Sequence, residues 1–441
     1  MKCPKNVEYL LYSVLMFDIN KTMKYISRIA DNILREDLAI FGAVQISGPK
    51  FCGKTETAKQ FAKSQINLQT DNSVANAMAS DPRILLLGDT PRLIDEWQEY
   101  PQIRNVIRHE VDERHSKGQF ILTGSATPND ATEAKLHSGA GRMSRMHMRT
   151  MTWSELGWSN GRVKLKDILA GKKIESGVTE TSIQDITKYL VIGGWPEYID
   201  TSEEVARRKN RAYVTNIIES DISRVSGINR DPARVRSIFE SYARNIATPA
   251  KVSTIVSDAS KENGIELDRK TVTGYLSDLT RLMIVDDLPA WNTHIRSSAK
   301  LRSTPKRHLV DPSLAAAILN LSSDALIKDL NYTGFLFESQ VIHDLRVYAE
   351  ALGAAVYYYR DSDGDEVDAI IEMPDHKFAA FEVKLGIGSV EEAAGSLIRF
   401  KNKLTDKKHK DLISLNVVVS SGFAATRPDG INVIPLDALG V

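Results

Sequence analysis

Short apolar runs alternate with longer amphipathic stretches in the first third of the chain. The runs are bounded by glycine, proline or charged residues and cover Ala39–Gly48, Arg83–Asp89, Arg92–Trp97 and Gln119–Ser125. Between them lie patterns with helical spacing, such as TETAKQFAKSQ and YPQIRNVIRHEVDERHSKG. Strands that alternate with helices predict a parallel sheet with crossover connections. We therefore expect an α/β domain over residues 23–158.

The pattern becomes helical and rich in charge after about Trp158, so residues 159–228 are predicted to form a helical lid or linker. Residues 229–304 contain a helix from Ser253 to Glu262, a glycine-containing turn, a second helix from about Asp268, and the strand MIVDDLPAW. This order is typical of a winged helix. Such domains contact either DNA or other proteins, and both interpretations stay open. The segment after the strand carries five bases and suits phosphate contact: Arg296, Lys300, Arg302, Lys306 and Arg307.

A glycine-rich motif in the first domain predicts a phosphate-binding site. GPKFCGKT, Gly48 to Thr55, fills the GxxxxGK(S/T) pattern directly between a predicted strand and a predicted helix, which is the context that a phosphate-binding loop needs. Loop amides and the helix N-terminus bind a polyphosphate, Lys54 reaches the outer phosphates, and the Thr55 hydroxyl ligates magnesium. ATP and Mg²⁺ are the expected cofactors. The predicted nucleotide contacts are Gly48, Pro49, Lys50, Phe51, Cys52, Gly53, Lys54, Thr55 and Glu56.

The two strands that follow end in polar side chains. Asp95 is expected to hold magnesium, and Glu96 to polarise the attacking water as a general base. Thr123 and Ser125 end the next strand, where they suit contact with the γ-phosphate or the water, although turn and cap roles are an open alternative.

A glycine pair precedes two further arginines, Arg142 and Arg145. An arginine at this place suits contact with the γ-phosphate of a neighbouring subunit, so Arg142 is a candidate catalytic residue and a homo-oligomer is expected. A solvated basic loop is the alternative.

Composition restricts the setting of this chemistry. The 441 residues include 57 Lys and Arg and 57 Asp and Glu, so any nucleic-acid surface must be a local patch. Two cysteines without disulfide or zinc spacing favour the cytoplasm. No apolar run reaches the roughly 18–20 residues that span a membrane. The stretch YLLYSVLMF, within an expected N-terminal extension over 1–22, lacks a cleavage site and predicts an extra helix or an upstream start codon.

Taken together, these motifs resemble the AAA+ type P-loop ATPases of bacteria and archaea that carry a C-terminal domain related to restriction endonucleases. The resemblance covers the chain from about Tyr25. It depends on YISRIAD, GAVQISGPKFCGKT, PRLIDEWQEYP, GQFILTGSATP, HSGAGRMSRM, GGWPEY, GFLFESQVIHDLRVYA, EVDAII and FEVKLG. It implies ATP binding and hydrolysis, with Lys54, Thr55, Asp95 and Glu96 at the nucleotide-site positions of the family.

The expected C-terminal domain, residues 305–441, has its own candidate site. AAVYYYRDSDGDEVDAIIEMPDHKFAAFEVKLG predicts three strands joined by tight turns. The two-residue alternation places Glu382 and Lys384 on one face, with Asp368 beside them on the neighbouring strand. This is the constellation of restriction-type nucleases, in which Asp368 and Glu382 would hold a metal and Lys384 would orient or activate water. Glu338 is a further candidate ligand, while proline is replaced by Val367 before Asp368.

Two functions remain open from the sequence. In the first, the chain is an ATPase whose nucleotide state controls a nuclease-like module that contacts DNA or RNA, for which the basic stretch RFKNKLTDKKHK offers a backbone track. In the second, it is an ATP-dependent switch or assembly scaffold with a catalytically inactive nuclease-like domain.

Overall fold

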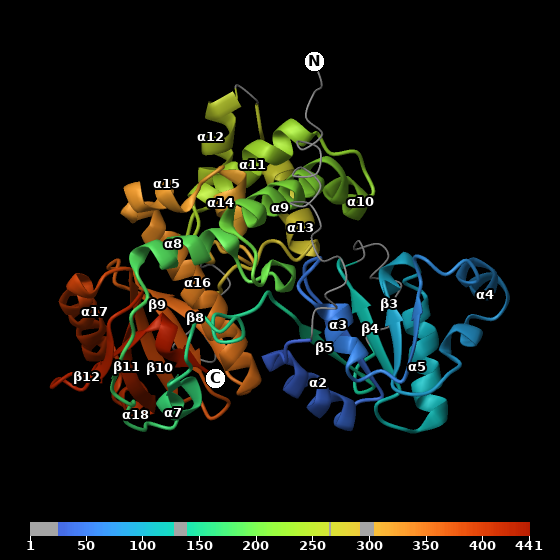
Figure 1. The fold of residues 1–441 in the computed structure, drawn as a ribbon, viewed down its shortest axis with the longest axis horizontal. Helices are drawn as coiled ribbons and strands as arrows, with labels where there is room; N and C mark the ends of the chain where they lie inside the picture. The colour runs from blue at the N-terminus through green and yellow to red at the C-terminus, as the bar shows by residue number, and fades with distance from the viewer. Residues whose placement is uncertain (1–24, 128–138, 264–265, 292–303) are drawn as a thin grey trace, which may run out of the picture.

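The computed structural model describes residues 25–127, 139–263, 266–291 and 304–441. The expected N-terminal extension over 1–22 lies outside these residues. Three units surround one long helix, α16 (Leu330–Ala351), which lies in the middle of Figure 1. Within the described residues, no helix is both long enough and apolar enough to cross a bilayer.

The first unit is the expected α/β domain. Its strands form a parallel sheet in the order β2-β3-β4-β1-β5. The strands are β1 (Ala43–Ser47), β2 (Ser64–Asn67), β3 (Arg92–Asp95), β4 (Phe120–Gly124) and β5 (Met143–His147). The helices are α2 (Ile29–Ile40), α3 (Lys54–Lys59), α4 (Val74–Ser80) and α5 (Ile103–Arg114). Apolar side chains fill both faces of the sheet, as is usual when helices cover parallel strands.

One predicted strand of this sheet was wrong, and two of its strands were not predicted. The run Arg83–Asp89 is no strand, because Pro82–Leu86 forms a 3₁₀ helix (η1), in which the Asp81 side chain accepts a hydrogen bond from the Arg83 backbone N–H. Strands β2 and β5 were not predicted, since SQIN and MSRMH show neither an apolar run nor a regular alternation of polar with apolar residues. β3 and β4 lie where the pattern placed them.

The second unit is a helical bundle. It comprises α8 (Ile183–Ile192), α9 (Glu203–Asn216), the π-turn η4 (Ile217–Asp221), α10 (Ile222–Ser226), α11 (Pro232–Arg244), α12 (Val252–Asn263), α13 (Arg269–Arg281), α14 (Ser313–Ile318) and α15 (Ser323–Lys328). Helices α12 and α13 match the predicted pair. Isolated antiparallel bridges at Val285–Leu309 and Leu288–Lys306 follow them. Helices α14 and α15 pack against α8, α9 and α11, so the packing does not change at the expected boundary of 304/305.

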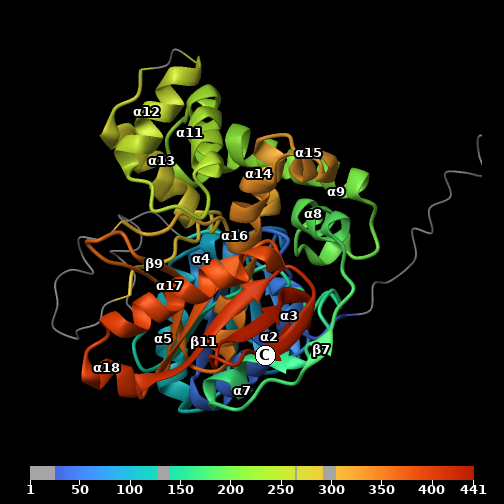
Figure 2. The same ribbon diagram turned by 90° about the vertical axis from the view of Figure 1, so that its left-hand side faces the viewer.

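The third unit is built around a seven-stranded mixed sheet in the order β7-β12-β13-β11-β10-β9-β8. Its strands include β8 (Ala355–Arg360), β9 (Glu366–Glu372) and β10 (Phe378–Lys384), the three predicted strands, followed by β11 (Leu412–Val419), β12 (Phe423–Thr426) and β13 (Asn432–Pro435). Helices α17 (Val390–Lys403) and α18 (Asp406–Asp411) lie on the outer face, as Figure 2 shows.

A segment expected in the helical lid joins this third unit instead. β7 (Gly177–Val178) pairs with β12, β6 (Val163–Lys164) pairs with β14 (Leu439–Gly440), and α7 (Leu165–Leu169) packs on β11. Only the part of residues 159–228 from α8 onward therefore lies in the helical bundle.

Helix α16 contacts every unit. It packs on β8 and β10 of the mixed sheet, on α2 of the α/β domain and on α8 of the bundle. This position explains why its residues are buried on several sides, Leu336, Val341 and Leu345 among them, instead of along one stripe.

Candidate functional site

The phosphate loop leaves β1 between β4 and β5 and enters α3 at Lys54. Glycine is required at both ends of the loop. Gly53 has φ +102°, in the left-handed region, and a Cβ on Gly48 would lie 2.1 Å from the backbone oxygen of Met148. The close approach of Met148 fixes the loop against the segment that follows β5.

The Lys54 ammonium points into the loop. It is 6% exposed, and Nζ donates to the carbonyl oxygens of Gly48, at 2.9 Å, and Pro49, at 2.7 Å. The curled loop thus places a positive charge where the motif predicts the outer phosphates of a nucleotide. The loop residues therefore fit a polyphosphate.

A second group forms around the Asp95 carboxylate. Oδ1 accepts hydrogen bonds from the hydroxyls of Thr55, at 3.0 Å, and Thr123, at 2.5 Å, while Oδ2 accepts one from Asn67 Nδ2 at 3.0 Å. These residues meet because β1, β3 and β4 end at one edge of the parallel sheet. The Thr55 hydroxyl and the Asp95 carboxylate are adjacent oxygen donors, the kind that Mg²⁺ prefers, so they fit the expected metal.

Asn67 was missed by the sequence analysis. It ends β2 and pairs in register with Asp95. A polar residue at the end of a strand is a weak signal, and here the strand itself was not recognised.

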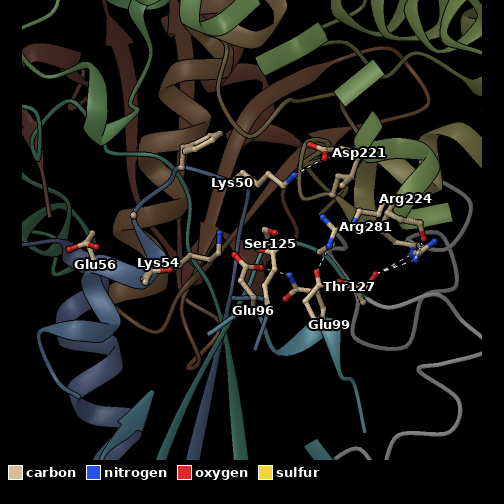
Figure 3. Close-up of a pocket in the computed structure, with 18 of the residues that line it drawn as sticks. Lys50, Lys54, Glu56, Glu96, Glu99, Ser125, Thr127, Asp221, Arg224 and Arg281 are labelled. Carbon is tan, nitrogen blue, oxygen red and sulfur yellow. Dashed lines mark hydrogen bonds and ion pairs between the residues drawn. The ribbon is translucent and has the colours of Figure 1, made fainter. Parts of the chain in front are cut away.

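Glu96 follows β3 with φ +56°, an unusual conformation for a residue other than glycine. Its carboxylate accepts a hydrogen bond from the Gln98 side chain and lines the same cavity as Ser125. Figure 3 shows Glu96 and Ser125 facing the space in front of Lys54. Thr123, by contrast, is bound to Asp95.

A cavity of about 700 Å³ opens in front of the loop. One wall consists of the phosphate loop with Glu56, Glu96 and Ser125, and the other consists of residues from η4, α10 and α13. Its volume is in the range of small-molecule sites. The cavity therefore lies between the α/β domain and the helical bundle.

Polar contacts join the two walls of this cavity. Lys50 Nζ lies 2.6 Å from Asp221 Oδ1, Arg224 pairs with Glu99, and Arg281 donates to the Thr127 backbone oxygen (Figure 3). Within the bundle, Arg281 also donates to the Val225 backbone oxygen. Arg281 was not predicted as a site residue, because it ends α13, the second helix of the predicted winged helix.

Arg28, another residue that the sequence analysis missed, supports the loop from behind. It is 6% exposed. Its guanidinium donates to the backbone oxygens of Cys52, at 2.9 Å, and Arg149, at 3.1 Å, and to Glu155 Oε1, at 3.0 Å. A planar group with several fixed donors suits this bracing role.

Arg142 lies away from the cavity. It precedes β5, whose Met143 pairs with Ala43 at the start of β1, and therefore lies at the opposite end of the sheet from the loop. Its guanidinium is about half exposed and binds Asp112 on α5 at 2.8 Å.

The C-terminal carboxylates meet as predicted, but with an additional partner. The backbone N–H of Val383 donates to Asp368 Oδ2 at 2.9 Å, and Lys384 Nζ lies 3.7 Å from Glu382 Oε2. The ammonium of Lys306 lies among the acids, at 2.7 Å from Glu338 and 2.8 Å from Asp368, with Glu366 at 2.6 Å. A cavity of about 380 Å³ adjoins this cluster.

Burial and mutual charge shift the pKa values of the groups in this cluster. Burial, with the nearby charge of Asp368, raises the pKa of Glu338 to about 8 and raises the pKa of Glu382 well above its ordinary value. Burial alone would lower the pKa of Lys306, but the surrounding carboxylates raise it well above the usual range. Among the residues that the structure describes, no group of three or more His, Cys, Asp or Glu side chains is arranged to hold a metal ion.

The expectation of a basic wing was wrong for Lys306 and Arg307. Both are buried, and Arg307 binds Asp287 at 2.5 Å and the Ala250 backbone oxygen at 2.9 Å. The cost of burying these two cations is offset because each has an acidic partner. Arg296, Lys300 and Arg302 lie outside the described residues.

The stretch RFKNKLTDKKHK is also partly neutralised by acids. Lys403 binds Asp361 at 2.7 Å and Asp365 at 2.5 Å, and Lys408 lies 3.4 Å from Glu372. These contacts weaken the case for a continuous track along a nucleic-acid backbone.

Comparison with known proteins agrees with the geometry of the first unit. Residues 41–157 match a family model described as an AAA domain. The chain contains an AAA-type P-loop ATPase domain. Residues 183–325 and 333–439 match two models described as domains of unknown function, DUF8612 and DUF4143. The first of these extends over α14 and ends within α15, in agreement with the packing of α14 on α8, α9 and α11.

Two relatives that match over most of their length are described as uncharacterized proteins. One is from Mycobacterium bovis and one from Mycobacterium tuberculosis, and each is 24% identical over 354 residues, or 80% of this chain and 72% of the relative. Among solved structures, the Aeropyrum pernix ORC1 protein in complex with DNA matches with 16% identity and a TM-score of 0.26, over 70% of this chain and 94% of that one.

Proposed function

We propose that the chain binds ATP with magnesium between the phosphate loop and the helical bundle, and hydrolyses it. The observation that carries this proposal is the Asp95 carboxylate, which receives hydrogen bonds from Thr55, Thr123 and Asn67 beside the loop. The cavity in front of it has the volume of a ligand site.

Each side chain then has a definite task. The Lys54 ammonium turns from the loop carbonyls to the outer phosphates, and the loop amides bind the phosphate oxygens. Thr55 and Asp95 would hold a magnesium ion, which would neutralise charge on the phosphates. Glu96 orients a water molecule and accepts its proton, while Ser125 donates a hydrogen bond to the phosphate or to that water.

Nucleotide binding also acts on the helical bundle. A triphosphate in the cavity competes with Asp221 for Lys50 and attracts Arg281 away from the Thr127 backbone oxygen. The position of the bundle therefore depends on the nucleotide, as in a switch. Of the two sequence hypotheses for the C-terminal domain, the burial of Lys306 among its carboxylates favours the scaffold over nucleic-acid cleavage.

The proposal includes a homo-oligomer. Arg142 lies at the far end of the sheet from its own loop, so it meets a γ-phosphate only in another copy. Its exposure of nearly half of the side chain suits such an intermolecular contact.

Phosphate release and binding of a fluorescent ATP analogue test the proposal. Lys54→Ala is expected to abolish binding, whereas Glu96→Gln keeps the affinity and lowers turnover by about 10²- to 10⁴-fold. The exposed residues Lys172 and Glu113 supply matched controls, Lys172→Ala and Glu113→Gln, which should behave as the wild type. Absence of ATP binding by the wild type refutes the proposal, and unchanged turnover in Glu96→Gln removes Glu96 from the role of base.

A further inference from the structure

The carboxylate cluster of the C-terminal unit is assembled from distant parts of the chain. Glu338 comes from α16, Glu366 and Asp368 from β9, and Glu382 from β10. Lys306 comes from the segment that bridges Leu288, far from these elements in sequence. The five side chains form one contiguous group at the cavity of about 380 Å³.

The Lys306 ammonium fills the place that a metal would take. An ammonium has three N–H donors, and Nζ has three carboxylate partners, at 2.6, 2.7 and 2.8 Å. The side chain is only 2% exposed. The oxygens of Glu338, Glu366 and Asp368 that a divalent ion would use are thus already bound to a cation.

The backbone fixes Lys306 in this position. Its N–H donates to the Leu288 backbone oxygen at 3.0 Å, and its own oxygen accepts from the Leu288 N–H at 2.9 Å. Its neighbour Arg307 is buried against Asp287 and the Ala250 backbone oxygen. Withdrawal of Lys306 would therefore disrupt several interactions at once. With Lys306 in place, the residues do not fit a divalent metal.

We propose that the Lys306 ammonium is the resident cation of this cluster, so that the protein binds no divalent metal there, and that removal of the ammonium opens a latent divalent-cation site. Without Lys306 the four buried carboxyl groups lose the cation that three of them share, and a divalent cation would supply the missing positive charge. Lys384 does not supply the balancing charge in this proposal, since its ammonium lies 3.7 Å from Glu382 and its side chain is partly exposed.

Calorimetric titration of the full chain with Mn²⁺, without nucleotide, tests this proposal. All variants carry Asp95→Asn, so that the phosphate-loop donors do not contribute. The parent is expected to show no binding, and Lys306→Met is expected to bind one Mn²⁺, which the addition of Asp368→Asn abolishes. Lys384→Met is the matched control and should bind none, because Lys306 remains.

When the variants fold, two results overturn the proposal. One is Mn²⁺ binding by the parent that Asp368→Asn abolishes, and the other is a folded Lys306→Met variant that binds no Mn²⁺. If Lys306→Met does not fold, the variant Lys306→Met/Glu338→Gln/Asp368→Asn removes charge of both signs. Recovery of its circular dichroism and melting transition supports the assignment of Lys306 as the balancing charge, and failure to recover overturns it.

Discussion

Arg281 gives the sharpest test of a nucleotide site that lies between two units. It belongs to α13 of the helical bundle, yet its guanidinium lines the cavity opposite Lys54 and donates to the backbone oxygens of Thr127 and Val225. If ATP binds in this cavity, the guanidinium exchanges these neutral acceptors for phosphate oxygens. Arg281→Ala is therefore expected to weaken ATP binding.

The magnitude follows from this exchange of partners. The present bonds join a cation to neutral oxygens, whereas bonds to phosphate join two groups of opposite charge and are stronger. A net gain on the order of 1.5 kcal/mol, at the lower end of the range for one hydrogen bond to a charged group, equals about a tenfold change in Kd. Arg281→Lys should recover only part of it, because an ammonium lacks the planar fork of a guanidinium.

Fluorescence titration with labelled ATP measures this effect in a Glu96→Gln background, which prevents turnover. Arg234→Ala is the control, since Arg234 lies on α11 with a partly exposed ion pair to Asp231. An unchanged melting temperature in Arg281→Ala shows that loss of the hydrogen bond to the Thr127 carbonyl has not disrupted the fold. A Kd for Arg281→Ala within twofold of the parent, with unchanged melting, would refute the role of the helical bundle in binding nucleotide.

Three further outcomes are expected. Burial of His308 lowers its pKa to about 3, so below pH 6.5 the imidazole gains a proton in the unfolded chain but not in the folded one. This difference in proton uptake lowers the unfolding free energy by about 1.4 kcal/mol per pH unit, and His308→Asn should remove that loss. Urea denaturation at pH 7, 6 and 5 measures it, and an identical slope in the variant would contradict the reasoning. Asp286→Asn leaves Arg149, at 2.6 Å, and Arg346, at 3.0 Å, without their shared carboxylate, and should lower the unfolding free energy by about 3–5 kcal/mol; a loss below about 1 kcal/mol would count against a structural role. Arg142→Ala should lower turnover by roughly 10³-fold without changing ATP affinity, and wild-type turnover that is independent of dilution would exclude a contribution between subunits.

The residues of the phosphate site that the sequence predicted are those fixed by local rules. Gly48 to Thr55 form a contiguous strand–loop–helix segment, so their mutual geometry follows from the motif. Asp95 and Thr123 were expected nearby because parallel strands end at a common edge, and their hydrogen bond agrees with that expectation.

The missed residues depend on tertiary packing. Asn67 lies on a short strand with little apolar alternation, and Arg281 reaches the cavity only because α13 packs over the α/β domain. Lys306 meets Glu338 and Asp368 at separations of 32 and 62 residues. A run of bases usually indicates a solvated surface, and nothing local distinguishes the member that becomes buried with acids.

The pairing of β6 with β14 bears on the order in which the chain becomes native during synthesis. Val163 pairs with Leu439 in a separate two-stranded sheet, and Val178 pairs with Phe423 at the edge of the seven-stranded sheet, so two strands of the third unit come from residues translated long before their partners. The α/β domain has all its strands once His147 has left the ribosome. Val163, by contrast, can pair only after Leu439 has been synthesised, 276 residues later. Such distant pairing slows folding and prolongs exposure of unpaired strand edges. A stop codon at position 437 would therefore remove only the last five residues and still leave β6 without its partner strand. The loss of structure would be larger than the number of missing residues suggests.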